Sequence, residues 1–341
     1  MTKDNQTLDE LKNGVLRRRT IKNALLFRGD CQQSLFALAR REREAAFASR
    51  AVEVRSVIEL SNICRRKCKF CNIHNYEKHK KYLIDPSRFI SIVDYIYKRG
   101  RRVLLLQSGE NSSENYINLT AGYIRLAKRR YPGLKIILCL GNLGLRQYGK
   151  LRSAGADRYI LKFETSNAKL YSKIKPGDTL LRRTICMRYA KRTGFSLGTG
   201  NIVGLPGQSL NDLANDLLFL GRFKLSMASA SVFIPGEDSA YRNEPAGDID
   251  ITLNYISLMR IIYPRLIIPS TSSMEKLRRD GQYLGLMAGA NSVTIHDGTP
   301  EELKNSFPIY SVNRMTPNES RIKALVEKAG LTLSKKELPH A

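Results

Sequence analysis

The chain has 341 residues, 42% of them apolar and 26% charged, which is the composition of an ordinary globular protein with a sizeable core. Its six cysteines are too few for a disulfide-stapled secreted domain, and its start is polar. No run approaches the roughly 20 apolar residues of a membrane span. We therefore expect a cytoplasmic protein with reduced thiols and no membrane association. The net charge of +26 raises the affinity for polyanions such as nucleic acid, but the basic residues are dispersed along the chain. The charge alone therefore indicates an acidic partner without identifying it, and a dedicated nucleic-acid site is not expected.

Helical and strand patterns alternate along the chain. Residues 1–50 have helical spacing of apolar positions, for example Leu35, Leu38 and Ala39. Short apolar runs then predict strands at 54–60, 103–106, 135–140, 158–162, 197–203, 228–233, 265–268 and 292–295. The helical patterns between them include 86–98, 115–130, 143–154, 180–193, 210–219 and 251–262.

This alternation indicates an α/β fold. Parallel strands need a crossover, which is usually a helix, so strands separated by helices favour βαβ units. Eight such units close a (βα)8 TIM-type barrel. We predict an N-terminal helical extension over residues 1–50, the barrel over 51–310, and a C-terminal cap with a final helix near 319–329 over 311–341.

Three cysteines lie close together after the first predicted strand. Cys64, Cys68 and Cys71 share one eight-residue window, in a loop that a barrel places at its catalytic end. Three thiolates can bind three irons of a 4Fe-4S cluster and leave the fourth iron open to a ligand. The alternative is a zinc site with His74 as fourth ligand, in a basic protein that binds nucleic acid, although the second pair of ligands usual in structural zinc sites is missing.

The CxxxCxxC spacing, with Phe70 before the third cysteine, resembles the signature of radical S-adenosylmethionine (SAM) enzymes. The resemblance implies that the amino and carboxylate groups of SAM bind the open iron. It also implies that an electron from the reduced cluster cleaves SAM to a 5′-deoxyadenosyl radical. Two partners follow from this chemistry: a small-molecule substrate, and an external electron donor of flavodoxin or ferredoxin type.

Further segments resemble the FeFe-hydrogenase maturase HydE, in the group that includes methylornithine synthase (PylB) and biotin synthase. The segments are 107–110, 163–165, 204–208, 233–235, 269–272 and 288–291, within a resemblance that runs from about 54 to 310. The resemblance implies that Ser108, Gly109 and Glu110 receive the ammonium of SAM and that Arg183 pairs with the carboxylate of SAM. It also implies that Glu164 contacts SAM and that Gly204 lets the chain pass close to the nucleoside. Without the resemblance, Glu164 would be read as a charge near the N-cap of a helix and Arg183 as a surface helix residue.

The substrate side departs from the HydE pattern. Lys162 stands where HydE has an arginine, and lysine keeps the charge but loses the bidentate geometry. Thr271 and Ser272 keep the hydroxyls of a pair implicated in anion binding, His296 falls where HydE has a Pro-Asn pair, and Tyr310 is retained. We take these five residues as the candidate catalytic, substrate-side set.

These features predict a radical SAM enzyme of small-molecule or cofactor biosynthesis. It is HydE-like, with maturation of the FeFe-hydrogenase H-cluster as one role. A paralogue that rearranges an amino-acid-derived substrate is the alternative. The other cysteines, Cys31, Cys139 and Cys186, are expected to be buried and inert, although Cys139 falls on the catalytic side.

Overall fold

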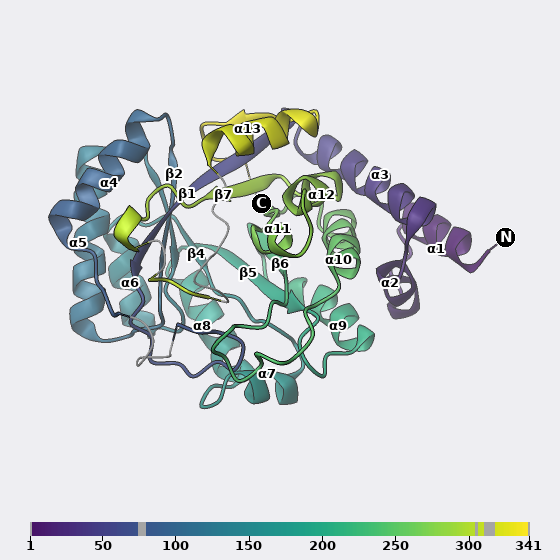
Figure 1. The fold of residues 1–341 in the computed structure, drawn as a ribbon, viewed down its shortest axis with the longest axis horizontal. Helices are drawn as coiled ribbons and strands as arrows, with labels where there is room; N and C mark the ends of the chain where they lie inside the picture. Colours follow the sequence, from purple (N-terminus) through teal and green to yellow (C-terminus); the bar gives the residue numbers. More distant parts are fainter. Residues whose placement is uncertain (1, 74–79, 304–305, 310–317, 340–341) are drawn as a thin grey trace.

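The computed structural model describes residues 2–73, 80–303, 306–309 and 318–339. In these ranges parallel strands curl around a central core, and helices cover the outside of the sheet (Figure 1). Within the same ranges, no helix has the length and apolar character needed to cross a membrane.

Three helices precede the first strand: α1 (Lys3–Lys12), α2 (Arg18–Leu25) and α3 (Gly29–Ala46). Helix α3 packs against α10 (Ile249–Ile262). The buried Asn254 of α10 donates to the carbonyls of Leu25 and Phe27 at 3.0 and 2.9 Å. These bonds fix the chain between α2 and α3, because they satisfy backbone carbonyls that the fold buries.

In the described part of the chain the sheet has eight strands, seven of which lie side by side in the order β6-β5-β4-β3-β2-β1-β7. They are β1 (Ala51–Ser61), β2 (Val103–Ser108), β3 (Lys135–Cys139), β4 (Arg158–Ile160), β5 (Ser196–Val203), β6 (Met227–Val232) and β7 (Ser292–Ile295). Each corresponds to a predicted run. The strands read as nearly continuous apolar segments because both faces of a parallel sheet are covered. The predicted α/β class is therefore confirmed.

The predicted strand at 265–268 does not form as an extended ladder in the structure. Ile267 makes a single parallel bridge to Met227 of β6, and Pro269 makes another to Ser292 of β7. Pro264 and Pro269 flank the run, and proline has no amide hydrogen to donate to a ladder. The segment thus lies between β6 and β7 with only two bridges.

The helices around the sheet are α4 (Pro86–Lys98), α5 (Glu114–Arg130), α6 (Leu145–Ser153), α7 (Ala168–Ile174), α8 (Leu180–Arg192), α9 (Leu210–Leu220), α10, α11 (Ser273–Leu277), α12 (Gly281–Met287) and α13 (Glu319–Lys328). Helix α4 begins where predicted because Asp85 accepts a hydrogen bond from the Arg88 amide at 3.0 Å and Pro86 occupies the first turn. Helices α7, α11 and α12 were not predicted, since each is too short to show a helical period.

The C-terminal segment closes the end of the sheet opposite the cysteine loop. Its strand β8 (Thr332–Ser334) pairs in parallel with the start of β1, and this strand was not predicted. Leu338 is buried in the inner apolar core together with Val57 and Ile137. The end of the chain is therefore a plug at the amino-terminal end of the strands, whereas the sequence predicted only a cap.

Buried charges hold this plug. Arg158 donates to both carboxylate oxygens of Glu53 at 2.9 Å, Arg55 donates to Glu53 at 2.7 Å, and the Leu338 amide donates to it at 2.9 Å. Burial opposes ionisation of Glu53, but the two guanidinium groups outweigh it and lower the pKa of this carboxyl to about 2. The pair remains charged inside the molecule because it is hydrogen-bonded on several sides.

Candidate active site

The cysteine loop follows β1 and lies across the carboxyl ends of neighbouring strands. Backbone bonds of 2.9 Å join the Arg65 amide to the Glu110 carbonyl and the Lys69 amide to the Ile174 carbonyl. A turn, in which the Cys71 amide donates to the Cys68 carbonyl at 3.2 Å, brings the last two cysteines of the loop together. The loop is thus fixed by the segment that follows β2 and by the end of α7.

The three thiols suit a cluster of several metal atoms. Burial, and then the charge of the neighbouring cysteines, raises the pKa of Cys68 and Cys71 well above the ordinary range. Among the described residues no three His, Cys, Asp or Glu side chains converge closely enough to hold a single metal ion. Three thiolates on one loop fit a 4Fe-4S cluster, because each thiolate binds a different iron.

The segment Ser108–Glu110 packs directly against this loop. The Gly109 amide donates to the Ser61 carbonyl at 2.9 Å, and the Glu110 amide donates to the Cys64 sulfur at 3.3 Å. A Cβ on Gly109 would lie 2.5 Å from the Ile63 carbonyl oxygen and 2.7 Å from the Cβ of Cys64. Glycine is therefore required here by the close approach of two backbones.

Glu110 and Arg183 face one another beside the loop. The Glu110 carboxylate pairs with Arg66 and lies 3.5 Å from the Arg183 guanidinium. Arg183 is only 2% exposed and also donates to the Tyr171 hydroxyl at 2.9 Å. The alternative reading of Arg183 as a surface residue is therefore wrong. The two groups predicted to bind opposite ends of an amino acid lie together, although neither lines the cavity described below.

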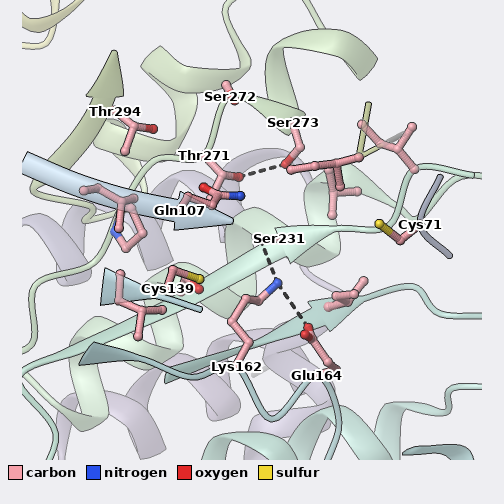
Figure 2. Close-up of a pocket in the computed structure, with 18 of the residues that line it drawn as sticks. Cys71, Gln107, Cys139, Lys162, Glu164, Ser231, Thr271, Ser272, Ser273 and Thr294 are labelled. Carbon is pink, nitrogen blue, oxygen red and sulfur yellow. Dashed lines mark hydrogen bonds and ion pairs between the residues drawn. The ribbon is translucent and has the colours of Figure 1, made fainter. Parts of the chain in front are cut away.

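Glu164 has a backbone conformation that is rare for a residue with a side chain. Its φ is 61°, in the left-handed region. Its amide donates to the Gly200 carbonyl and its carbonyl accepts from the Ile202 amide, so pairing with β5 imposes this conformation. The carboxylate forms an ion pair with Lys162 at 3.2 Å (Figure 2). Asn167, not Glu164, caps the following helix.

The turn after β5 also needs glycine. Gly204 has a φ of 88°, and a Cβ there would collide with the backbone of Gly247. Its amide donates to the side chain of Gln208 at 2.8 Å. Gln208 in turn donates to the buried carboxylate of Asp216, which also accepts the Ser166 amide at 2.6 Å. Asp216, which the sequence did not single out, thus joins the turns after β4 and β5.

A cavity of about 370 Å³ lies beneath the cysteine loop (Figure 2). Phe70 and Cys71 line it, so it opens onto the predicted cluster. Four of the five candidate substrate-side residues line it as well, together with Glu164: Lys162, Thr271, Ser272 and His296. Tyr310 lies outside the described residues, as does His74.

Two groups of polar side chains stand in the cavity wall. Lys162 lies 3.4 Å from the Ser231 hydroxyl, and the Thr271 hydroxyl lies 2.9 Å from that of Ser273 (Figure 2). Directly after β7, His296 places Nδ1 3.3 Å from a carboxylate oxygen of Glu59 on β1.

Several lining residues were missed by sequence reasoning. Met227, Ser229 and Ser231 all line the cavity from β6, and Gln107 lines it from β2. Alternate residues of a strand face the same side, so a period of two from one known lining residue could have found them. Cys186 is buried as expected, whereas Cys31 and Cys139 are only partly buried and Cys139 lines the cavity, so the expectation of burial was wrong for these two.

The amino-acid sequence is similar to a known protein family and to several characterised enzymes. Residues 58–220 match the radical SAM superfamily. The chain is 33% identical over 309 residues to the FeFe-hydrogenase maturase subunit HydE of Thermotoga maritima, which covers 89% of this chain and 87% of that protein. It is 26% identical over 267 residues to 3-methylornithine synthase of Methanosarcina barkeri, which covers 77% and 74%.

Solved structures share the fold. Methylornithine synthase (PylB) superposes with a TM-score of 0.83 at 22% identity, covering 96% of this chain and 97% of that one. The maturase HydG from Carboxydothermus hydrogenoformans gives a TM-score of 0.83 at 18% identity, covering 97% and 79%.

Proposed function

The chain belongs to the radical SAM superfamily, in the group related to HydE, and on that premise we propose that it is a HydE-like biosynthetic enzyme acting on a small molecule in the cavity beneath the cysteine loop. Members of this superfamily use a 4Fe-4S cluster and SAM, which together supply a 5′-deoxyadenosyl radical. This membership favours the cluster over the zinc hypothesis. The observation that carries the proposal is the cavity itself, which joins the cysteine loop to the candidate substrate residues.

The proposed cofactor contacts follow from the positions of the side chains. We assign the cluster to Cys64, Cys68 and Cys71, and the amino and carboxylate groups of SAM to Glu110 and Arg183. A carboxylate suits an ammonium and a guanidinium fork suits a carboxylate. The remaining proposed contacts surround the loop or line the cavity, and they are Phe70, Ser108, Gly109, Glu164 and Gly204.

The proposed substrate carries an anionic group. The Lys162 ammonium and the hydroxyls of Thr271 and Ser272 are groups that can donate hydrogen bonds, and they lie on the wall of one cavity. His296 and Tyr310 complete the proposed set. The cavity volume lies near the lower end of the range for small-molecule sites, about 300–1,000 Å³. The cavity is therefore of a size that suits a small-molecule substrate.

The remaining proposals concern the frame of the enzyme. We count the segment that bridges β6 and β7 as the remaining strand of a (βα)8 barrel over residues 51–310. A helical extension over 1–50 precedes this barrel, and a cap over 311–341 follows it. All six cysteines are free, which supports a reducing, cytoplasmic location. The chemistry needs an external one-electron donor, and we propose one of flavodoxin or ferredoxin type.

A second candidate function is a paralogue that rearranges an amino-acid-derived substrate. Lys162 and His296 stand where HydE has other residues, and His296 is paired with the buried Glu59. Similarity to methylornithine synthase supports this candidate as well.

A maturation assay tests the first candidate against the second. The purified chain is added to an FeFe-hydrogenase maturation mixture that lacks only HydE, and hydrogen evolution is measured. Restored hydrogenase activity, lost again in Lys162→Ala, is expected for a HydE-like maturase. No restoration by a chain that still cleaves SAM would support the paralogue instead.

A further inference from the structure

The gaps between the cysteines of the loop are filled mainly by basic residues. Arg65, Arg66 and Lys67 separate the first two cysteines, and Lys69 follows the second. Arg65 and Lys67 are exposed, and neither forms an ion pair with any carboxylate in the described part of the chain. Their charges therefore face solvent directly beside the thiols.

The segment from the end of α7 to the start of α8 extends this surface. Arg66 donates to the Gly177 carbonyl at 3.5 Å, and the backbone bond from Lys69 to Ile174 holds the two segments together. Leu181 is 69% exposed, more than any other large apolar side chain in the described ranges. We call five exposed residues of these two segments the cluster-loop surface: Arg65, Lys67, Lys173, Leu181 and Arg182.

Acidic groups near this surface are already engaged. Glu110 pairs with Arg66 and Arg183, and Asp178 lies 3.6 Å from Arg183. Glu110 is 10% exposed and Asp178 is fully buried. The exposed face is therefore cationic around one apolar side chain. Complementary charge steers a partner to its site, and a central apolar contact holds it there.

We propose that the cluster-loop surface is the docking site of the electron donor, an acidic one-electron carrier protein. The inference rests on the proposed function, because only a cluster held by this loop makes the surface a point of electron entry. One electron passes from the reduced carrier to the cluster, the carrier is oxidised by one electron, and no bond forms or breaks.

The position of the loop supports this assignment. Cys71 and Phe70 face the cavity, whereas Arg65 and Lys67 face solvent. The donor thus approaches the cluster from outside while substrate occupies the inner side. Electron transfer falls steeply with distance, so a donor has to dock where the cysteines lie closest to the surface.

The test measures cluster reduction by stopped-flow absorbance in the full-length reconstituted protein. The reductant is either the hydroquinone of an acidic flavodoxin or photoreduced deazaflavin, which is small and neutral. For the wild-type chain, we expect the bimolecular rate with flavodoxin to fall steeply as ionic strength rises, as it does for electrostatically steered association.

Two variants probe the surface and one serves as control. Arg65→Glu with Lys67→Glu is expected to lower the flavodoxin rate at low salt about tenfold or more and to flatten its salt dependence. Leu181→Ala is expected to weaken association without changing the salt dependence. The control, Arg17→Glu with Arg18→Glu, makes the same change in net charge at the exposed start of α2, far from α8 in Figure 1.

The outcomes separate this proposal from the function on which it rests. Reduction by deazaflavin is expected to be unchanged in every variant, which shows that the cluster is intact. A wild-type flavodoxin rate in the Arg65/Lys67 variant, or an equal loss in the Arg17/Arg18 control, would overturn the docking site. Weaker binding of a single-stranded oligonucleotide at an unchanged flavodoxin rate would assign the surface to nucleic acid and equally overturn it. No cluster in the wild-type chain would refute the proposed function instead.

Discussion

Single residues beside the cysteine loop are tightly constrained by their surroundings. Gly109 is enclosed by a carbonyl oxygen and a cysteine Cβ, neither of which is the end of a flexible side chain. Glu164 is held with a positive φ by its bonds to β5. Strain of this kind persists only where the surrounding structure imposes it, and it concentrates at functional sites.

Gly109→Ala is expected to displace the loop and to lower cluster content. The added Cβ forces the backbone near Ile63 and Cys64 to move, at a cost of about 1–3 kcal/mol. Iron and sulfide are measured after anaerobic reconstitution. The control is Gly122→Ala in α5, where a Cβ meets nothing within 4 Å and alanine favours the helix. Full iron content in Gly109→Ala would show that the loop tolerates the shift.

The pairing of His296 with Glu59 is expected to fix the tautomer of the imidazole. A carboxylate beside Nδ1 keeps the proton there and leaves Nε2 as an acceptor. The chain has only four histidines, so nitrogen NMR resolves them, and His296→Gln identifies the resonance. Glu59→Gln should convert a single tautomer into a mixture. The same mixture in the wild-type chain would contradict the pairing.

At the level of elements, β1 and β4 share a buried ionic contact with the C-terminal segment. Glu53 binds two arginines and a backbone amide, and it is completely buried. Breaking such a contact leaves uncompensated charges inside the core.

Glu53→Gln is expected to lower the free energy of unfolding by about 3–5 kcal/mol, because Arg55 loses its counter-charge and Arg158 keeps only Glu337. The pKa of Glu53 is lowered from 4.5 to about 2, so its contribution is present above pH 4.5 and is lost as the pH falls towards 2. Denaturant unfolding at several pH values measures both effects. The exposed Glu44 of α3 provides the control, and Glu44→Gln should change stability little. Equal losses in both variants would contradict the account.

Sequence patterns predicted the strands well where both faces are buried. Strands β1 to β7 were found because their apolar runs are continuous. The run at 265–268 failed because the flanking prolines limit its pairing. Strand β8 was missed because three residues carry no period, and only the pairing with β1 makes them a strand.

The candidate site was predictable where a motif is local. The cysteines, Glu110 and Arg183 were identified through the resemblance to a known family. Glu59 was missed because its partner His296 lies far along the sequence and comes close only through the adjacency of β1 and β7. Ser229 and Ser231 were missed because no predicted site residue lies on β6 from which the alternation of the strand could be counted.

At the scale of the whole molecule, one end of the sheet contributes stability and the other end holds the candidate active site. The amino-terminal end is closed by Leu338 and the Glu53 contact, which contribute stability. The carboxyl-terminal end holds the cysteine loop and the cavity, where a fold of this kind places its chemistry. Part of the excess positive charge lies at this end, on the cluster-loop surface, where we propose that it attracts the acidic electron donor.

The most direct test of the central claim is the quantity of 5′-deoxyadenosine formed from SAM by the anaerobically reconstituted chain with photoreduced deazaflavin. We predict about four irons per chain, as for one 4Fe-4S cluster, together with 5′-deoxyadenosine, and neither in Cys68→Ala. A wild-type chain that binds stoichiometric zinc and forms no 5′-deoxyadenosine, or a Cys68→Ala variant that still forms it, would contradict the assignment.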